Sequence, residues 1–153
     1  MGHHGALNDM AAAVLDASLI VLLGAVTVSD LRTRLVPDGA LVASIAVAAP
    51  VCLLSDPAGV PARLLAALAA GAFLLVFAIA RPGGMGLGDV KLAAVLGFYL
   101  GTRTAEAMVV AFVAGSIAVL VLLARHGWAA RGRTIPFAPF LAIGALVAVA
   151  PQP

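Results

Sequence analysis

Long apolar segments alternate with short polar connections along the whole chain. None of them shows the strict alternation of apolar and polar residues that a membrane β-barrel requires, so helices are expected. A helix needs about 20 apolar residues to cross a bilayer, within a usual range of roughly 17–25. The pattern therefore predicts an all-α, polytopic integral membrane protein with about six transmembrane helices. The six segments are 11–29, 39–54, 62–80, 88–101, 104–124 and 135–150.

The second, fourth and sixth segments are short, and each begins beside proline or glycine. A helix that stops below the membrane surface leaves space for a water-filled recess, where irregular backbone is tolerated at membrane depth. Small residues are also frequent in the segments, which predicts close approach of helices in lipid. The glycines concerned are Gly24, Gly71, Gly97, Gly101, Gly115 and Gly144.

The composition supports a lipid environment. Hydrophobic residues make up 63% of the 153-residue chain and charged residues 10%, against about 25% charged residues in an ordinary soluble domain. The formal net charge of +2 is too small to indicate a nucleic-acid partner. Cys52 is the single cysteine, which excludes a disulfide framework and a thiolate metal cluster. We expect one membrane-embedded domain over residues 1–153, with no metal and no cofactor.

Basic residues between the segments predict the orientation in the membrane. With six crossings, alternate connections lie on the same side, and seven Lys and Arg residues fall on one side against two on the other. Cytoplasmic loops carry the excess of Lys and Arg, so the richer side is predicted to be cytoplasmic, with both termini outside. The seven are Arg32, Arg34, Arg81, Lys91, Arg125, Arg131 and Arg133, and the two are Arg63 and Arg103.

Two aspartates lie on the richer side, where apolar segments meet basic connections. Asp30 ends the first segment and Asp89 opens the fourth. A charge at such a position is costly, so an acidic residue there is a functional hypothesis by default. Two carboxyl groups held close together cannot both ionise readily, and the pair then keeps one proton near neutral pH. One group can activate water while the other polarises a carbonyl, which is the chemistry of an aspartic protease.

The glycine-rich run before Asp89 includes Gly86 and Gly88. Glycine opens backbone conformations that are closed to other residues and lets another chain approach closely, as an extended peptide substrate would. Lys91 is predicted either to influence the ionisation of Asp89 or to anchor the helix at the membrane interface.

Pro37 and Asp38 open the second segment. Asp38 is interpreted first as a turn or helix-capping residue, and a supporting role in the site is the alternative. Asp16 would lie roughly 21 Å from Asp30 along a helix, so we expect it at the opposite membrane boundary rather than in the same site.

Three stretches together are similar to the type IV prepilin peptidases, which are membrane-embedded aspartyl proteases of the GxGD class. The first is SDLRTRLVPD at 29–38, the second is GMGLGDVKL at 84–92, and the third is IPFAPFL at 135–141, where Ala138 replaces a common glycine. Their order and spacing match the family. The larger members carry an N-terminal methyltransferase region with clustered cysteines, so this chain resembles the compact, peptidase-only form.

The resemblance implies removal of the short basic leader from prepilins or pilin-like proteins, as part of a type IV pilus or protein secretion system. Cleavage would occur at the cytoplasmic face of the cell's inner membrane and would need no metal. In this resemblance Asp30 and Asp89 are the catalytic pair. The supporting residues would be Gly86, Gly88, Lys91, Asp38 and Pro37.

Other functions are compatible with the same carboxyl groups. A small transporter or proton-relay subunit would move ions with them, although transport sites usually lie near the bilayer midplane. A scaffold subunit of a pilus machine would not need them, and a presenilin-like protease would cut within a helix of its substrate. The sequence carries no signal for an oligomeric state.

Overall fold

The protein is almost entirely helical in the part that the structure describes. The structure is a computed structural model, and it describes residues 2–80, 85–126 and 137–150. These residues form six α-helices and two short 3-10 helices and contain no strand, which confirms the predicted all-α class. The α-helices are α1 (Gly2–Thr33), α2 (Asp38–Ser55), α3 (Val60–Ala80), α4 (Leu87–Leu100), α5 (Thr104–His126) and α6 (Ala138–Val149), and the 3-10 helices are η1 (Pro57–Gly59) and η2 (Gly101–Arg103).

The predicted segments and the observed helices agree in order and closely in their ends, except in α1. This helix begins at Gly2, nine residues before the predicted segment, and continues to Thr33. Hydropathy marks where a helix is apolar, whereas the helix itself continues as long as its backbone hydrogen bonds are made and no breaker intervenes. The pattern therefore predicts the type of element better than its ends.

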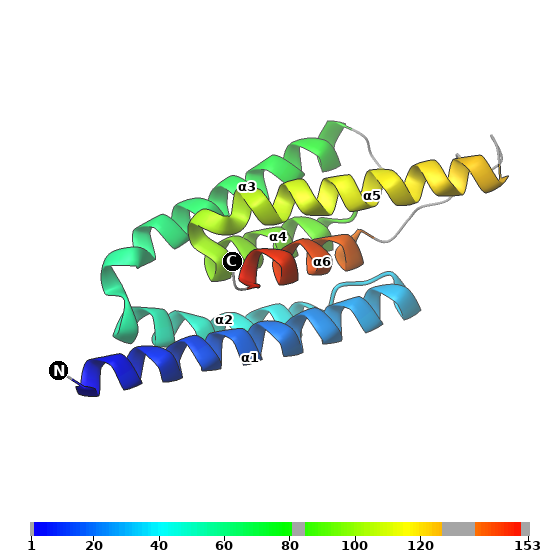
Figure 1. The fold of residues 1–153 in the computed structure, drawn as a ribbon. Helices are drawn as coiled ribbons and strands as arrows, with labels where there is room; N and C mark the ends of the chain where they lie inside the picture. The colour runs from blue at the N-terminus through cyan, green and yellow to red at the C-terminus, as the bar shows by residue number, and fades with distance from the viewer. Residues whose placement is uncertain (1, 81–84, 127–136, 151–153) are drawn as a thin grey trace.

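The helices run side by side, and successive helices are antiparallel (Figure 1). One end of the molecule gathers the C-terminus of α1 and the N-termini of α2, α4 and α6 (Figure 1). We call it the site end, because it holds Asp30 of α1 and Asp89 of α4. Among helix pairs, α3 packs most extensively on α4 and α5 on α6, while α1 packs on α2 and α6. The helix that carries Asp30 therefore packs mainly on α2 and α6, whereas the helix that carries Asp89 packs mainly on α3.

The described basic residues separate between the two ends as the sequence predicts. Arg32, Lys91 and Arg125 belong to α1, α4 and α5 at the site end, and Arg34 follows α1 there (Figure 1). Arg63 and Arg103 belong to the opposite end, where each donates a hydrogen bond to the C-terminus of another helix: Nη1 of Arg63 to the Tyr99 carbonyl at 2.7 Å and Nη1 of Arg103 to the Ala148 carbonyl at 3.1 Å. Arg81, Arg131 and Arg133 lie outside the described residues. The membrane side that each end faces stays a prediction.

Four described helical stretches are long and apolar enough to cross a membrane. They are Leu7–Thr33, Asp38–Ser55, Pro57–Ala80 and Leu87–Arg125, the last of which combines α4, η2 and α5. The helices α4 and α6 have 14 and 12 residues, so each is shorter than a usual perpendicular span. The chain is a membrane protein, and the count of six crossings remains a prediction.

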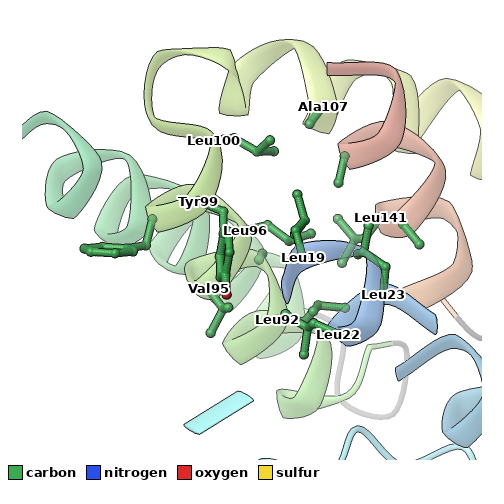
Figure 2. Close-up of a cluster of buried hydrophobic side chains, with 14 of the residues drawn as sticks. Leu19, Leu22, Leu23, Leu92, Val95, Leu96, Tyr99, Leu100, Ala107 and Leu141 are labelled. Atoms are coloured by element: carbon green, nitrogen blue, oxygen red, sulfur yellow. The ribbon is translucent and has the colours of Figure 1, made fainter. Parts of the chain in front are cut away.

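A core of apolar side chains joins α1, α4 and α6. Leu19, Leu22 and Leu23 of α1 lie beside residues of α4 and α6 (Figure 2). Leu92 of α4 and Leu141 of α6 are fully buried within the same cluster. Tyr99 adds a polar link, since its hydroxyl donates to the Ser44 carbonyl of α2 at 2.8 Å and lies 3.0 Å from the Ser18 hydroxyl of α1.

Close helix packing depends on glycine at two crossings, as the frequency of small residues predicts. A Cβ atom at Gly97 of α4 would lie 2.6 Å from the Ala66 carbonyl oxygen of α3, and one at Gly144 of α6 would collide with the Ala107 carbonyl of α5. A Cβ atom at Gly24, by contrast, would meet nothing within 4 Å. Gly101 serves the backbone instead, because its φ of +56° makes the turn between α4 and η2. The prediction of close packing thus holds at Gly97 and Gly144 but not at Gly24.

Candidate active site

The structure brings together the two aspartates that the sequence singles out. Asp30 lies in the last turn of α1, and Asp89 lies in the first turn of α4. They are 5% and 9% exposed, and the charge of Asp30 acts on the carboxyl group of Asp89. Two acidic side chains from distant parts of the chain therefore share one buried region at the site end.

The carboxyl group of Asp30 is only partly satisfied. Its Oδ2 atom is buried and has no hydrogen-bond partner, and no other buried side-chain nitrogen or oxygen of the described residues shares this condition. The Arg34 guanidinium and the backbone amide of Ala138 both interact with this carboxyl group. Burying a polar oxygen without a partner costs free energy, so such an atom calls for a functional explanation.

Asp89 lies where a helix begins, which is a favourable place for a carboxylate because the helix dipole is positive there. Its backbone N–H donates to the Gly86 carbonyl at 3.1 Å, which forms the first turn of α4. The Gly86 amide interacts with the Asp89 carboxyl group. The residue before the helix thus helps to hold the carboxyl group that follows it.

Gly86 and Gly88 are required less for backbone freedom than the sequence suggests. Gly86 has φ of −78° and ψ of 146°, and the described residues with positive φ are Arg34 and Gly101. The expectation that glycine supplies an unusual backbone conformation is therefore wrong for Gly86 and Gly88. The need at Gly88 is for space, because an added Cβ would lie 2.9 Å from Cβ of Val36. Gly83 and Gly84 lie outside the described residues.

Asp38 does not cap α2, which corrects its first interpretation. The N-cap position belongs to Pro37, which makes no side-chain cap and whose carbonyl accepts the Ala40 N–H at 3.0 Å. The Asp38 carboxylate instead accepts two hydrogen bonds from the Lys91 ammonium, at 2.8 and 2.9 Å. Lys91 and Asp38 thus link the first turns of α4 and α2 beside the aspartate pair.

The start of α6 is a part of the site that the sequence analysis did not assign. Ala138 is fully buried, and its amide interacts with the Asp30 carboxyl group. Pro139, in the first turn of α6, is a helix-start signal that could have located this amide near the beginning of the sixth apolar segment. Nothing in the sequence pairs this helix start with Asp30. Ile135 and Pro136, which also belong to the stretch noted in the sequence, lie outside the described residues.

Asp16 lies away from this pair. It lines a cavity of about 290 Å³ together with Arg63 and Arg103, toward the opposite end of the molecule. The described residues hold no group of three or more His, Cys, Asp or Glu side chains of the kind that binds a metal ion.

The fold and the site together define an all-helical membrane protein with a buried pair of aspartates at one end of its helices. The chain belongs to the type IV leader peptidase family, whose model matches residues 17–124 and so includes both aspartates. It is also similar to the prepilin leader peptidase/N-methyltransferase of Bacillus subtilis (strain 168), with 35% identity over 141 residues. That match covers 89% of this chain and 54% of the relative, so the chain spans about half the relative's length. No solved structure matches the chain significantly.

Proposed function

We propose that the protein is a membrane aspartic endopeptidase that removes the leader peptide from prepilins or pilin-like proteins. Membership of the type IV leader peptidase family supports this function, as does the similarity to the prepilin leader peptidase/N-methyltransferase of Bacillus subtilis. The observation that carries the proposal is the buried, unpartnered Oδ2 atom of Asp30, in a carboxyl group that interacts with Asp89. An oxygen in that condition is available to bond a water molecule or a substrate carbonyl.

In the proposed reaction, the two carboxyl groups divide the work of general acid–base catalysis. The ionised carboxyl draws a proton from water, which attacks the carbonyl carbon of the scissile peptide bond. The protonated carboxyl donates a hydrogen bond to the carbonyl oxygen as negative charge develops there. The tetrahedral intermediate then collapses, the C–N bond breaks, and the leaving amine takes a proton from the carboxyl pair.

Water must reach this site within or beside the bilayer. The short helices α4 and α6, at about 1.5 Å per residue, are roughly 21 and 18 Å long, whereas the hydrocarbon core of a bilayer is about 30 Å thick. Both helices begin at the site end (Figure 1). In the proposed topology of six crossings, these two helices stop short of the surface and leave an aqueous recess above the aspartates.

The proposed site faces the cytoplasm, at the inner membrane of the cell. Arg32, Arg34, Lys91 and Arg125 support this orientation, because they cluster at the site end and cytoplasmic ends of membrane helices are rich in Lys and Arg. The substrate leader would then be removed before the pilin leaves the membrane. The residues proposed to support the site are Gly86, Gly88, Lys91, Asp38 and Pro37.

Co-expression with a pilin-like precursor tests the function. The wild type should shorten the precursor, and Asp30→Asn or Asp89→Asn should lower the cleavage rate by at least about 10²–10⁴-fold, the usual contribution of a general acid or base. Asp16→Asn is the matched control, since it removes an acid of the same helix that lies away from the pair. Normal cleavage by folded forms of both site variants would reject the aspartic mechanism. Absence of cleavage by the wild type, with several pilin-like precursors, would reject the substrate class.

A further inference from the structure

The turn between α1 and α2 starts directly beside Asp30. The helix α1 ends at Thr33, and Arg34 then adopts a φ of 55°, in the left-handed region. The Arg34 N–H donates to the carbonyl of Asp30 itself, at 2.9 Å. The path that residues 34–37 take is therefore tied to the backbone that carries the Asp30 carboxyl group.

Ser29 closes this turn with its side chain. The Ser29 hydroxyl donates to the Leu35 carbonyl at 2.8 Å, across six positions of the chain. The neighbouring hydroxyl of Thr33 donates to the Ser29 carbonyl at 2.9 Å, a bond within the last turn of α1. The two hydroxyl oxygens lie 3.4 Å apart, but each directs its proton to a different carbonyl. Ser29 therefore holds the turn, whereas Thr33 donates within its own helix.

Val36, in this turn, packs against α4, the helix that holds the second aspartate. A Cβ atom added to Gly88 would lie 2.9 Å from Cβ and 3.0 Å from Cγ2 of Val36, so the valine side chain lies directly over this glycine. Real Cβ atoms do not approach other atoms so closely, and any larger residue at this position would push the turn away. Gly88 precedes Asp89, so the contact is one residue from the carboxyl group.

The packing of the helices makes this contact important. The helix α1 packs chiefly on α2 and α6, whereas α4 packs chiefly on α3. The turn of residues 34–37 therefore connects the Asp30 end of α1 to the Asp89 end of α4 by a short route. The Lys91–Asp38 ion pair adds a second connection, but its side chains are largely exposed and such pairs hold weakly.

We infer that Ser29 and Val36 are positioning residues that set the separation of the two aspartates. Ser29 fixes the conformation of the turn, and Val36 packs the turn against Gly88. This inference rests on the proposed catalytic role of Asp30 and Asp89. It goes beyond that role because neither Ser29 nor Val36 needs to touch the substrate.

The first experiment is a double-mutant cycle on the cleavage of a prepilin peptide by the purified full chain. Gly88→Ala should lower kcat about hundredfold, since a displacement of about 1 Å can cost that much, and should leave KM within about threefold. Val36→Gly should lower kcat about tenfold because the turn loses its packing contact with Gly88. The double variant should also be about tenfold down, because the added methyl group then occupies the space that the valine has left. A double variant about a thousandfold down, as for independent effects, would overturn the inference, and so would a fully active Gly88→Ala.

The second experiment compares the two hydroxyls. Ser29→Ala should lower kcat about tenfold at unchanged KM, and Ser29→Thr should restore it, because threonine keeps the donor for the Leu35 carbonyl. Thr33→Ala is the matched control and should change kcat less than about twofold. Equal effects of Ser29→Ala and Thr33→Ala would show that neither hydroxyl acts through the turn.

A third measurement does not depend on activity. In a Cys52→Ala background, Val36→Cys with Gly88→Cys should form a disulfide on mild oxidation. The two Cβ atoms would start 2.9 Å apart, and a small outward shift of the turn brings them to the roughly 3.5–4.5 Å that a disulfide spans. Val36→Cys with Gly24→Cys is the control pair and should not, since nothing lies within 4 Å of a Cβ at Gly24. A disulfide in the first pair without prepilin cleavage by the wild type would reject the proposed function and keep the contact. Absence of the disulfide would reject the positioning contact whatever the enzyme cleaves.

Discussion

The Lys91 ammonium lies 2.8 Å from one carboxylate oxygen of Asp38 and 2.9 Å from the other, so one ion pair joins the first turns of α4 and α2. The two side chains are 55% and 67% exposed. Exposed ion pairs contribute about 0–1 kcal/mol, because water already solvates both charges well. The pair therefore orients two helix ends without adding much to their stability.

Breaking this pair should have a small effect on stability. We expect Asp38→Asn and Lys91→Gln each to change the free energy of unfolding by no more than about 1 kcal/mol. Denaturant unfolding in detergent micelles measures it. The charge-swapped variant, Asp38→Lys with Lys91→Asp, serves as the control and should resemble the wild type. A loss of several kcal/mol in either single variant would contradict the assignment of the pair as an exposed surface contact.

A side chain at Gly97 should destabilise the protein markedly. The added Cβ of Gly97→Ala would lie 2.6 Å from backbone atoms of Ala66 and Ala67, and backbone cannot move aside as a flexible side chain can. Overpacking of this kind costs typically about 1–3 kcal/mol. Gly24→Ala is the control, because its Cβ meets no atom within 4 Å and alanine favours a helix. Equal thermal stabilities of the two variants would contradict the close crossing of α3 and α4.

Removal of the Tyr99 hydroxyl should affect stability without affecting catalysis. Tyr99→Phe deletes the donor to the buried Ser44 carbonyl and should cost about 0.5–1.5 kcal/mol. Ser18→Ala should cost less, because the Ser18 hydroxyl is only part-buried and also bonds the Leu15 carbonyl of its own helix. Tyr99 lies about 15 Å along α4 from Asp89, so kcat of the folded variant should equal that of the wild type. A tenfold loss of kcat would place Tyr99 in the catalytic machinery instead.

The rate of cleavage should fall in both acid and alkaline solution. The proposed reaction needs one ionised and one protonated carboxyl group. When both are protonated, neither accepts a proton from water. When both are ionised, neither polarises the scissile carbonyl. A profile of kcat/KM against pH, with a peptide that has no titrating group near the cleaved bond, measures this dependence. A value of kcat/KM that stays constant from acid to alkaline pH would contradict shared acid–base catalysis.

Labelling of single cysteines tests the proposed orientation. Arg125→Cys lies at the site end and Thr102→Cys at the opposite end, and both native side chains are exposed. In intact cells with Cys52 replaced by alanine, a membrane-impermeant thiol reagent should label Thr102→Cys alone, and lysed cells should be labelled at both positions. The reversed pattern would place the aspartates outside the cytoplasm.

The order and type of the helices could be predicted from the sequence because each apolar segment needs to satisfy its own backbone within lipid, which only a helix does locally. The ends could be predicted less well. The helix α1 continues nine residues before its apolar segment, since hydrogen bonding continues where hydropathy falls. The identity of Asp30 and Asp89 was also predictable, because a charge beside a membrane segment is unusual enough to stand out.

The sequence by itself determined that this is a helical membrane protein with two notable acids and a likeness to prepilin peptidases. Only the tertiary structure decided that Asp38 binds Lys91 rather than capping α2, that Ala138 reaches Asp30, and that Val36 covers Gly88. The reason is physical. Membrane insertion and helix formation depend on neighbouring residues, whereas these three contacts depend on how helices far apart in the sequence pack side by side, and no local pattern records that.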